Sequence, residues 1–284
     1  MRQAPVRSTC ADSPPRPQRW VVAAWLTALP LGALADDCSA PQLGLLTGVE
    51  HSLWRETDAQ GLSLLQEKGT LRVAGLTATG DCSALGWTAR WTLARGDRDY
   101  DGRSTTQAPF QTQTRLQTQH LAAQVWLPVQ HGWDAGMQVG YRSIDRDIAG
   151  RGNVLGYPEQ FGYWQVALGA RYQQTLNEHV RLTAAAWLGG GPGGRVHLDL
   201  PRADPTTLRL GRSRLLALDL GLVGGVPSEH EGWAWRAEVS YRQELHQSGP
   251  ETTLLRNGTP VGSASQPRIV QRHLGATLHA TYRF

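Results

Sequence analysis

The sequence lacks long apolar runs. No stretch of eighteen apolar residues occurs, and the mean hydropathy is −0.37, so a membrane-spanning helix is not expected. Helical periodicity is almost absent, which argues against a helical domain. The sequence also has no phosphate loop, no zinc-ligand spacing and no Gly-x-Ser-x-Gly motif, so enzymes that depend on these motifs are excluded. We accordingly expect no metal and no cofactor.

The longest apolar run lies near the start, at residues 20–35, and reads WVVAAWLTALPLGALA. Four arginines precede it and small residues end it, a pattern typical of a secretory signal peptide. The alternatives are a buried helix or a membrane anchor, but the run is short for a span and Pro30 would interrupt it. We therefore expect residues 1–35 to be a cleaved signal peptide and residues 36–284 to form one domain.

Cysteine and lysine are scarce, with three cysteines and only Lys68 among the 28 basic residues. The leader carries four arginines and one aspartate, a net charge of +3, so the formal charge of +4 falls to +1 for residues 36–284. A surface for nucleic acid is therefore not expected. Cys10 leaves with the leader, and Cys38 and Cys82 are expected to form a disulfide in an oxidising compartment. The alternative is two free thiols.

Alternation of apolar and polar residues with a period of two runs through the rest of the chain. In the last segment, for example, Leu274 and Leu278 fall on one face while His273 and His279 fall on the other. The same test predicts ten strands. We place them at 45–56, 61–78, 84–95, 110–128, 133–146, 161–175, 179–200, 207–225, 232–246 and 268–284.

The two faces of these strands differ in chemistry. The apolar face carries the tryptophans Trp87, Trp91, Trp164, Trp233 and Trp235. The polar face carries the charged residues Glu50, Arg90, Arg142, Arg171, Arg181, Asp219, Arg236, Glu238, Arg242 and Glu244. In a soluble sandwich or lipocalin-like barrel, the competing fold, the apolar face would point inward and the polar face would meet water. Charges and glycines on one face with tryptophans on the other instead favour a barrel in a membrane.

The connections alternate between short turns and long loops, the long ones at 96–109, 147–160 and 248–266. The sequence therefore predicts an all-β fold, a closed antiparallel transmembrane β-barrel with short periplasmic turns and long extracellular loops. The chain ends on Phe284, which resembles the terminal aromatic signal read by the barrel-assembly machinery. We expect the protein in the outer membrane of a Gram-negative bacterium.

The inward charged side chains are expected to pair with one another and fill the lumen, because unpaired charges there would be costly. A ten-stranded barrel is only slightly wider than the eight-stranded barrels that side chains fill. The strand number therefore disfavours a wide porin, and a narrow channel remains as an alternative function.

Three arginines, Arg115, Arg214 and Arg272, fall on the lipid-facing side. At roughly 2.5 Å of height per tilted residue they lie about 30 Å from the periplasmic end, just above the apolar band. Guanidinium groups at that height can bind lipopolysaccharide phosphates in a bidentate manner, and Arg212 and Arg268 would join them. The alternative is simple snorkelling of interfacial arginines.

Two motifs suggest hydrolytic chemistry. DRDYD supplies Asp97 and Asp99, and RVHLDL supplies His197 and Asp199, which point inward by parity. An acidic pair that faces a His–Asp couple can position and deprotonate a water molecule. By parity, however, the two aspartates face lipid unless the chain bulges at Gly96.

The segments GLLTGVEHSLWRE, GDRDYDG and GMQVGYR resemble segments of the omptins in the same order. Omptins are ten-stranded outer-membrane proteases that share a fold superfamily with ten-stranded opacity-type adhesins. The resemblance implies that Asp97 and Asp99 match the omptin Asp-x-Asp pair. His197 and Asp199 reverse the order of the omptin Asp-x-His couple.

The sequence thus predicts a non-catalytic outer-membrane barrel whose surface loops bind an extracellular protein or glycan, an adhesin-type role. Lipopolysaccharide is the expected lipid partner at its outer rim. An omptin-like endopeptidase is the second alternative and a narrow channel is the third.

Overall fold

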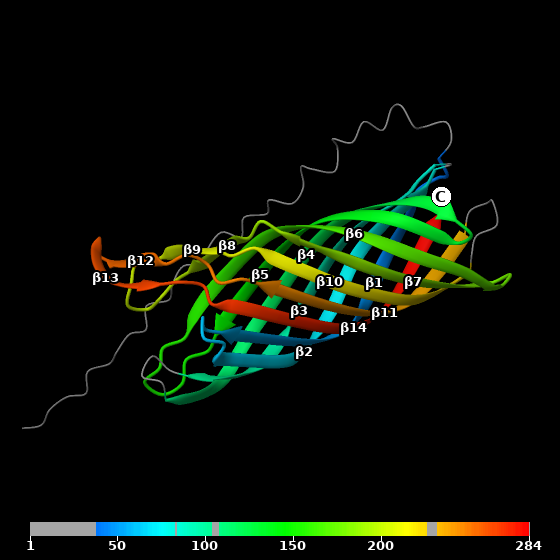
Figure 1. Ribbon diagram of the computed structural model, residues 1–284. Coiled ribbons are helices and arrows are strands. Elements are labelled where there is room, and N and C mark those ends of the chain that lie inside the picture. The colour runs from blue at the N-terminus through cyan, green and yellow to red at the C-terminus, as the bar shows by residue number, and fades with distance from the viewer. Residues whose placement is uncertain (1–37, 83, 104–107, 226–231, 284) are drawn as a thin grey trace, which may run out of the picture. The chain divides into compact units, whose positions relative to one another are not determined.

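The computed structural model describes residues 38–82, 84–103, 108–225 and 232–283. Ten long antiparallel strands follow one another around a ring, and each is hydrogen-bonded to two neighbours (Figure 1). They are β1 (Gln42–Thr57), β2 (Ser63–Asp81), β3 (Gly86–Arg103), β4 (Pro109–Gln130), β5 (Trp133–Ile148), β6 (Tyr157–Asn177), β7 (Val180–Gly191), β10 (Ser213–Gly224), β11 (Gly232–His246) and β14 (Arg268–Arg283). The all-β class and the ring of ten strands agree with the prediction.

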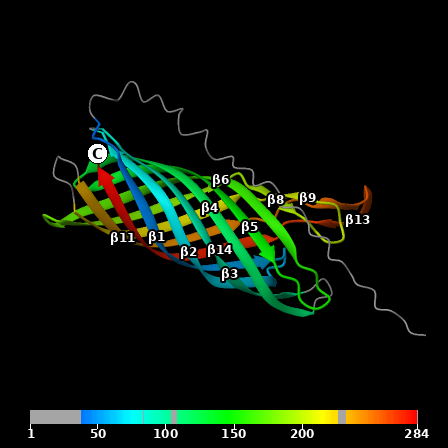
Figure 2. The ribbon, with the colours of Figure 1, turned by 180° about the vertical axis from the view of Figure 1, so that it is seen from behind.

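The ring has two distinct ends. One end, here called the turn end, carries the β2–β3, β4–β5 and β6–β7 connections and the Cys38–Cys82 disulfide that the cysteine count predicts. At the other end, the hairpin end, two short hairpins extend beyond the ring in both views (Figures 1 and 2). No helix in the described ranges is long and apolar enough to cross a membrane. The predicted leader and Phe284 lie outside the described residues.

The first hairpin pairs β8 (Gly194–Leu198) with β9 (Thr206–Leu210), and β8 also pairs with the upper part of β6. The sequence analysis joined β7 to β8 and β9 to β10 as two continuous strands, which is wrong. Gly193, with a φ of +112°, lies in the break between β7 and β8 and admits a backbone conformation that other residues rarely adopt.

The second hairpin, β12 (Thr252–Arg256) with β13 (Thr259–Ala264), lies where the sequence predicted only a long loop. Its turn residues Asn257 and Gly258 both have positive φ, at 51° and 76°, as a two-residue hairpin of the right twist requires. The Asp204 carboxylate, in the β8–β9 hairpin, accepts hydrogen bonds from both of their backbone N–H groups. The two hairpins are therefore tied together.

The strands near the hairpin end are longer than predicted. Residues 96–102, expected in a loop, continue β3 and pair in unbroken register with β4, from Asp97 opposite Arg115 to Gly102 opposite Phe110. This pairing persists because Arg98 and Tyr100 point inward and are buried there. The charged stretch is thus part of a strand, with Asp97 and Asp99 on its outer face and Arg98 and Tyr100 on its inner face.

The outer surface changes character along the ring. In the half next to the turn end, the turn half, large apolar side chains face outward and are exposed, among them Leu45, Leu76, Leu127, Met137, Leu168, Leu188, Leu220 and Leu278. In the half next to the hairpin end, the hairpin half, the outward side chains are polar or charged, among them Arg55, Lys68, Arg95, Asp97, Asp99, Gln113 and Arg115.

The interior changes in the opposite sense. The hairpin half contains an apolar core that includes Trp54, Leu65, Leu71, Leu116, Ile144, Phe161, Val196, Leu208 and Ile269, each almost fully buried. The interior of the turn half is lined mostly by polar and charged side chains, with a tryptophan pair, Trp126 and Trp187, whose ring centres lie 4.5 Å apart. The two halves of the same strands therefore have opposite sidedness.

Candidate functional site

Asp97 and Asp99 lie on the outer face of β3, where they alternate with buried Arg98 and Tyr100. The Asp97 carboxylate is 3.9 Å from the guanidinium of Arg115 on β4, and both side chains are largely exposed. An ion pair so open to solvent adds little to stability. The parity prediction that these aspartates face outward holds, because the chain has no bulge at Gly96.

His197 lies on the exposed face of β8, between the buried side chains of Val196 and Leu198. The sequence analysis expected it to point inward. The break that contains Gly193 shifts the register of β8 by one residue relative to β7, and this reverses the direction of every side chain beyond it. The imidazole Nδ1 lies 3.2 Å from the Thr207 hydroxyl, and the half-buried Asp199 follows the strand.

The structure does not bring these two pairs together. In the sheet, β4, β5 and β6 separate β3 from β8, which corresponds to about 19 Å measured along the curved sheet at roughly 4.8 Å per strand. Asp97, Asp99 and His197 also face away from the interior. In the described part of the chain, no group of three or more His, Cys, Asp or Glu residues is arranged to hold a metal ion.

A different set of charged residues does converge, inside the hairpin half. We call it the Arg146 cluster, and it consists of Glu56, Glu67, Arg98, Arg146 and Glu159. Arg146 Nη2 donates to Glu67 at 2.7 Å, and its Nη1 donates to Glu56 at 3.1 Å and also to Glu159. All five side chains are buried, and three carboxyl groups share two guanidinium groups.

The surroundings of the Arg146 cluster hold it in place. The Trp54 indole donates to Glu56 at 2.8 Å, and the Arg146 guanidinium lies over its ring at 5.0 Å. Burial raises the pKa of the Glu159 carboxyl to about 7, and the neighbouring carboxyl groups of Glu56 and Glu67 also raise it, against the opposing effect of Arg146. One proton is therefore gained or lost near neutral pH.

This cluster was missed because two strands were predicted too short at the hairpin end. Arg98 lies after the predicted strand end at 95, and Glu159 lies before the predicted strand start at 161. Arg146 is the last residue of its predicted strand. The period-two alternation of these strands continues past the point where the outer face becomes polar. Following it further would have placed these residues on the inner face.

The predicted inward charges do form a network deeper in the ring. Glu244 accepts hydrogen bonds from the Tyr163 hydroxyl at 2.7 Å and from Gln165 at 3.0 Å, and it pairs with Arg242 at 2.9 Å. Glu238 pairs with Arg90 at 3.1 Å. These contacts fill the middle of the lumen with bonded side chains.

The five predicted rim arginines, Arg115, Arg212, Arg214, Arg268 and Arg272, are all exposed. Arg214 on β10 and Arg272 on β14 lie at the edge of the apolar surface. Each is one outward position closer to the hairpin end than the last exposed leucine of its strand, Leu216 or Leu274. Arg272 also donates to Gln243 at 3.2 Å.

The same level of the outer face holds arginines that the sequence analysis did not single out. Arg55, Arg72 and Arg95 are exposed there, and Arg72 lies directly opposite Arg95 in the β2–β3 register. Two like charges in such a pair repel each other unless an anion lies between them.

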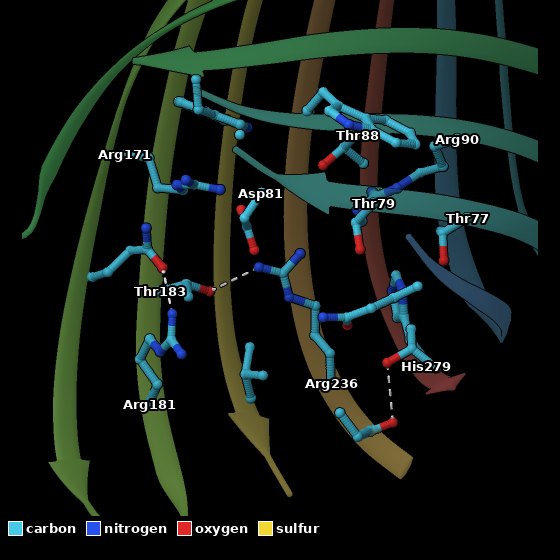
Figure 3. A pocket seen from close by; sticks show the side chains of 18 of the residues that line it. Thr77, Thr79, Asp81, Thr88, Arg90, Arg171, Arg181, Thr183, Arg236 and His279 are labelled. Atoms are coloured by element: carbon cyan, nitrogen blue, oxygen red, sulfur yellow. Dashed lines mark hydrogen bonds between the residues drawn. The ribbon is translucent and has the colours of Figure 1, made fainter. Parts of the chain in front are cut away.

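At the turn end the lumen opens into a cavity of about 290 Å³ (Figure 3). Arg171, Arg181 and Arg236 extend into it from β6, β7 and β11. The arginines there outnumber the acidic side chains that line the cavity.

No protein-family model and no curated protein sequence matches the chain. Among solved structures it is similar to the outer membrane protease OmpT from Escherichia coli, with a TM-score of 0.51 and 12% identity, over 88% of this chain and 97% of that chain. It is also similar to the Pseudomonas putida toluene transporter TodX, with a TM-score of 0.33 and 10% identity, over 86% and 89% of the two chains.

A third similar structure is Neisserial surface protein A, with a TM-score of 0.33 and 10% identity, over 85% of this chain and 97% of that chain. At such low identities the similarity concerns the fold alone, and it depends on the OmpT comparison. The chain has a β-barrel fold similar to that of this outer-membrane protein.

Proposed function

We propose that the chain is an integral protein of a Gram-negative outer membrane, with its turn half in the lipid and its hairpin half outside the cell. On β4 the outward apolar residues run from Leu121 to Val129, eight residue steps or about 20 Å at roughly 2.5 Å per tilted residue. This length is close to the apolar band of about 25 Å that such barrels present. The exposed Trp164, Trp233 and Trp235 fit the aromatic girdles at its borders.

The observation that carries the proposal is the reversal of sidedness within single strands. A soluble barrel would bury its apolar face along the whole strand, and a barrel embedded over its full length would expose it throughout. Here the outer face is apolar in one half and charged in the other. Lipid around the turn half and water around the hairpin half account for both.

We further propose that the role of the protein is to bind an extracellular protein or glycan through its hairpin end. The packed apolar core and the Arg146 cluster make the hairpin half a rigid base for the β8–β9 and β12–β13 hairpins. The filled lumen argues against conduction through the ring. The separation of Asp97 from His197 argues against an omptin-like endopeptidase.

Lipopolysaccharide is the proposed lipid partner at the border between the two halves. Arg214 and Arg272 lie one outward position above the apolar surface, and Arg72 and Arg95 lie side by side at its edge. A phosphate group between two guanidinium groups would relieve their repulsion and accept bidentate hydrogen bonds. We also keep the proposal that Phe284 is read by the barrel-assembly machinery.

The test is to replace residues 252–264, the β12–β13 hairpin, by a short Gly-Ser turn. Cells that display the intact protein should bind extracellular matrix proteins or glycans immobilised on an array. Cells that display the shortened protein should show no such binding. As a control for folding of the ring, both proteins should resist unfolding by a denaturing detergent until they are heated.

Two outcomes would contradict this function. One is cleavage of dibasic peptides by the protein refolded with lipopolysaccharide, if His197→Ala abolishes it. The other is a steady single-channel current across planar bilayers.

A further inference from the structure

We propose that the cavity at the turn end is a binding site for a small oxyanion with two or more negative charges, a phosphate or carboxylate compound. The statement that the ligand enters from the periplasm rests on the function proposed above, and the rest of the proposal does not. The cavity volume of about 290 Å³ corresponds to about ten water molecules at roughly 30 Å³ each, enough for a small ligand.

The walls of the cavity carry more positive than negative charge. Five arginines line it, Arg90, Arg171, Arg181, Arg236 and Arg283, together with one acidic residue, Asp81. Two more carboxylates pair with these arginines from behind. Asp134 accepts from Arg171 at 2.8 Å, and Glu238 lies 3.1 Å from Arg90 and 3.5 Å from Arg236. Asp219 lines the adjoining space together with Arg90, Arg171 and Arg236. Five guanidinium groups thus face four carboxylates, an excess of one positive charge.

Arg181 carries this excess charge. Its Nη1 donates to the neutral Gln173 side chain at 3.1 Å, and no carboxylate of the described residues lies within 4.0 Å of it. Elsewhere in the interior, arginines such as Arg146 and Arg242 are held by carboxylates. A guanidinium group that lacks such a partner attracts an anion, because no carboxylate of the described residues offsets its charge.

Hydrogen-bond donors that line the cavity are also left without acceptors. The Nε atoms of Arg90 and Arg236 are buried and have no partner among the described residues. Arg236 Nη2 reaches the Thr183 hydroxyl at 3.4 Å, a long and weak contact. An oxyanion supplies the acceptors that this set of groups lacks, since guanidinium groups bind phosphate and carboxylate through paired N–H donors.

The site is held ready rather than formed by the ligand. The Arg171 guanidinium lies 4.4 Å from the centre of the Trp126 ring, which packs on Trp187, while Asp134 accepts from its Nε. A side chain fixed in this way loses little freedom on binding. Trp126 lines the cavity, and the bonded network around Glu244 fills the lumen farther from the turn end, so the ligand enters and leaves at the turn end.

The experiment is calorimetric titration of the refolded full chain in a zwitterionic detergent with sodium pyrophosphate, citrate and chloride. We expect saturable binding of one pyrophosphate or citrate per chain and none of chloride. Binding of pyrophosphate alone assigns a phosphate ligand, and binding of citrate alone assigns a carboxylate ligand.

Variants locate the site. Arg181→Gln should lower the affinity at least tenfold, and Arg236→Gln serves as the second variant if the first does not refold. Arg151→Gln, an exposed arginine near the hairpin end, is the matched control and should leave the affinity unchanged. The proposal would be overturned if neither pyrophosphate nor citrate shows saturable binding. It would also be overturned if the folded Arg181→Gln and Arg236→Gln variants bind these anions as tightly as the unaltered protein. Neither result affects the surface role, because the hairpins take no part in this titration.

Discussion

The turn half and the hairpin half are built from the same strands, yet they place apolar side chains on opposite faces. On β4, Val125 and Leu127 face outward near the turn end, whereas Leu116 faces inward near the hairpin end and Arg115 faces outward. The pairing of β3 with β4 contains no register shift between these positions. The difference therefore comes from the sequence pattern alone. The same fold accepts apolar side chains on either face of its strands.

The two halves also treat interior charge differently. The hairpin half buries three glutamates around Arg146 and Arg98, while the turn half gathers arginines around a cavity. Arg146 in the first half is held by three glutamates, whereas Arg181 in the second has no carboxylate of the described residues within 4.0 Å. We infer that the first stabilises the structure and the second leaves room for a ligand.

The largest expected effect is that of Arg146→Leu. It leaves Glu56, Glu67 and Glu159 buried without their main partner, and breaking a buried ion pair in this way costs about 3–5 kcal/mol. Arg181→Gln in the turn half removes no ion pair and should cost less than about 1 kcal/mol. Urea unfolding in lipid vesicles measures both, and equal losses of stability would contradict the contrast between the halves.

The next largest effect is expected from a charge placed on the outer face, which should destabilise the turn half more than the hairpin half. Leu220→Arg introduces arginine in the middle of the apolar surface, where it should lower the free energy of unfolding by about 2–4 kcal/mol in a bilayer. The matched change Gln113→Arg, on the outer face of the hairpin half, should stay within about 0.5 kcal/mol. If the second change destabilises as much as the first, both halves lie in lipid.

The pH dependence of stability should reveal the Arg146 cluster. The pKa of Glu159 is about 7 in the folded protein and 4.5 ordinarily, so between these values the folded state binds more protons than the unfolded state. The free energy of unfolding should therefore rise as the pH falls from about 7 toward 4.5. Glu159→Gln should reduce this rise, to which Glu56 also contributes because its pKa is raised by burial. An unchanged slope in the variant would show that other groups cause it.

The smallest effect on stability is expected from the double variant Arg214→Ala and Arg272→Ala. Both side chains are exposed, so the free energy of unfolding should change by less than about 0.5 kcal/mol. The amount of lipopolysaccharide that copurifies with the protein should nevertheless fall. Undiminished lipopolysaccharide would end the proposed role of these arginines.

The sequence was sufficient to predict the strands and the inward charges of the turn half, because a period of two is a local property. Arg90 and Glu238, for instance, point inward and pair as expected. The hairpin half was harder to predict, since a polar outer face such as that of Asp97 and Asp99 has the composition of a loop.

The direction of His197 could not be predicted, because it depends on a one-residue shift at the break around Gly193. Which arginines lack a carboxylate partner was also out of reach. The partner of Arg90 is Glu238, 148 residues away in the sequence, so the sequence pattern does not reveal it. Arg181 instead contacts Gln173 across the β6–β7 turn.

The most direct test measures which surroundings each outward position of β4 meets. Nitroxide labels are attached to single cysteines introduced at Leu127, Ala123, Arg115 and Gln113 in a Cys10→Ser background, with the protein in bilayers. Collision rates with oxygen, which concentrates in lipid, and with a water-soluble nickel complex are then compared. The account predicts lipid exposure at positions 127 and 123 and water exposure at 115 and 113. Water exposure at all four positions would contradict it.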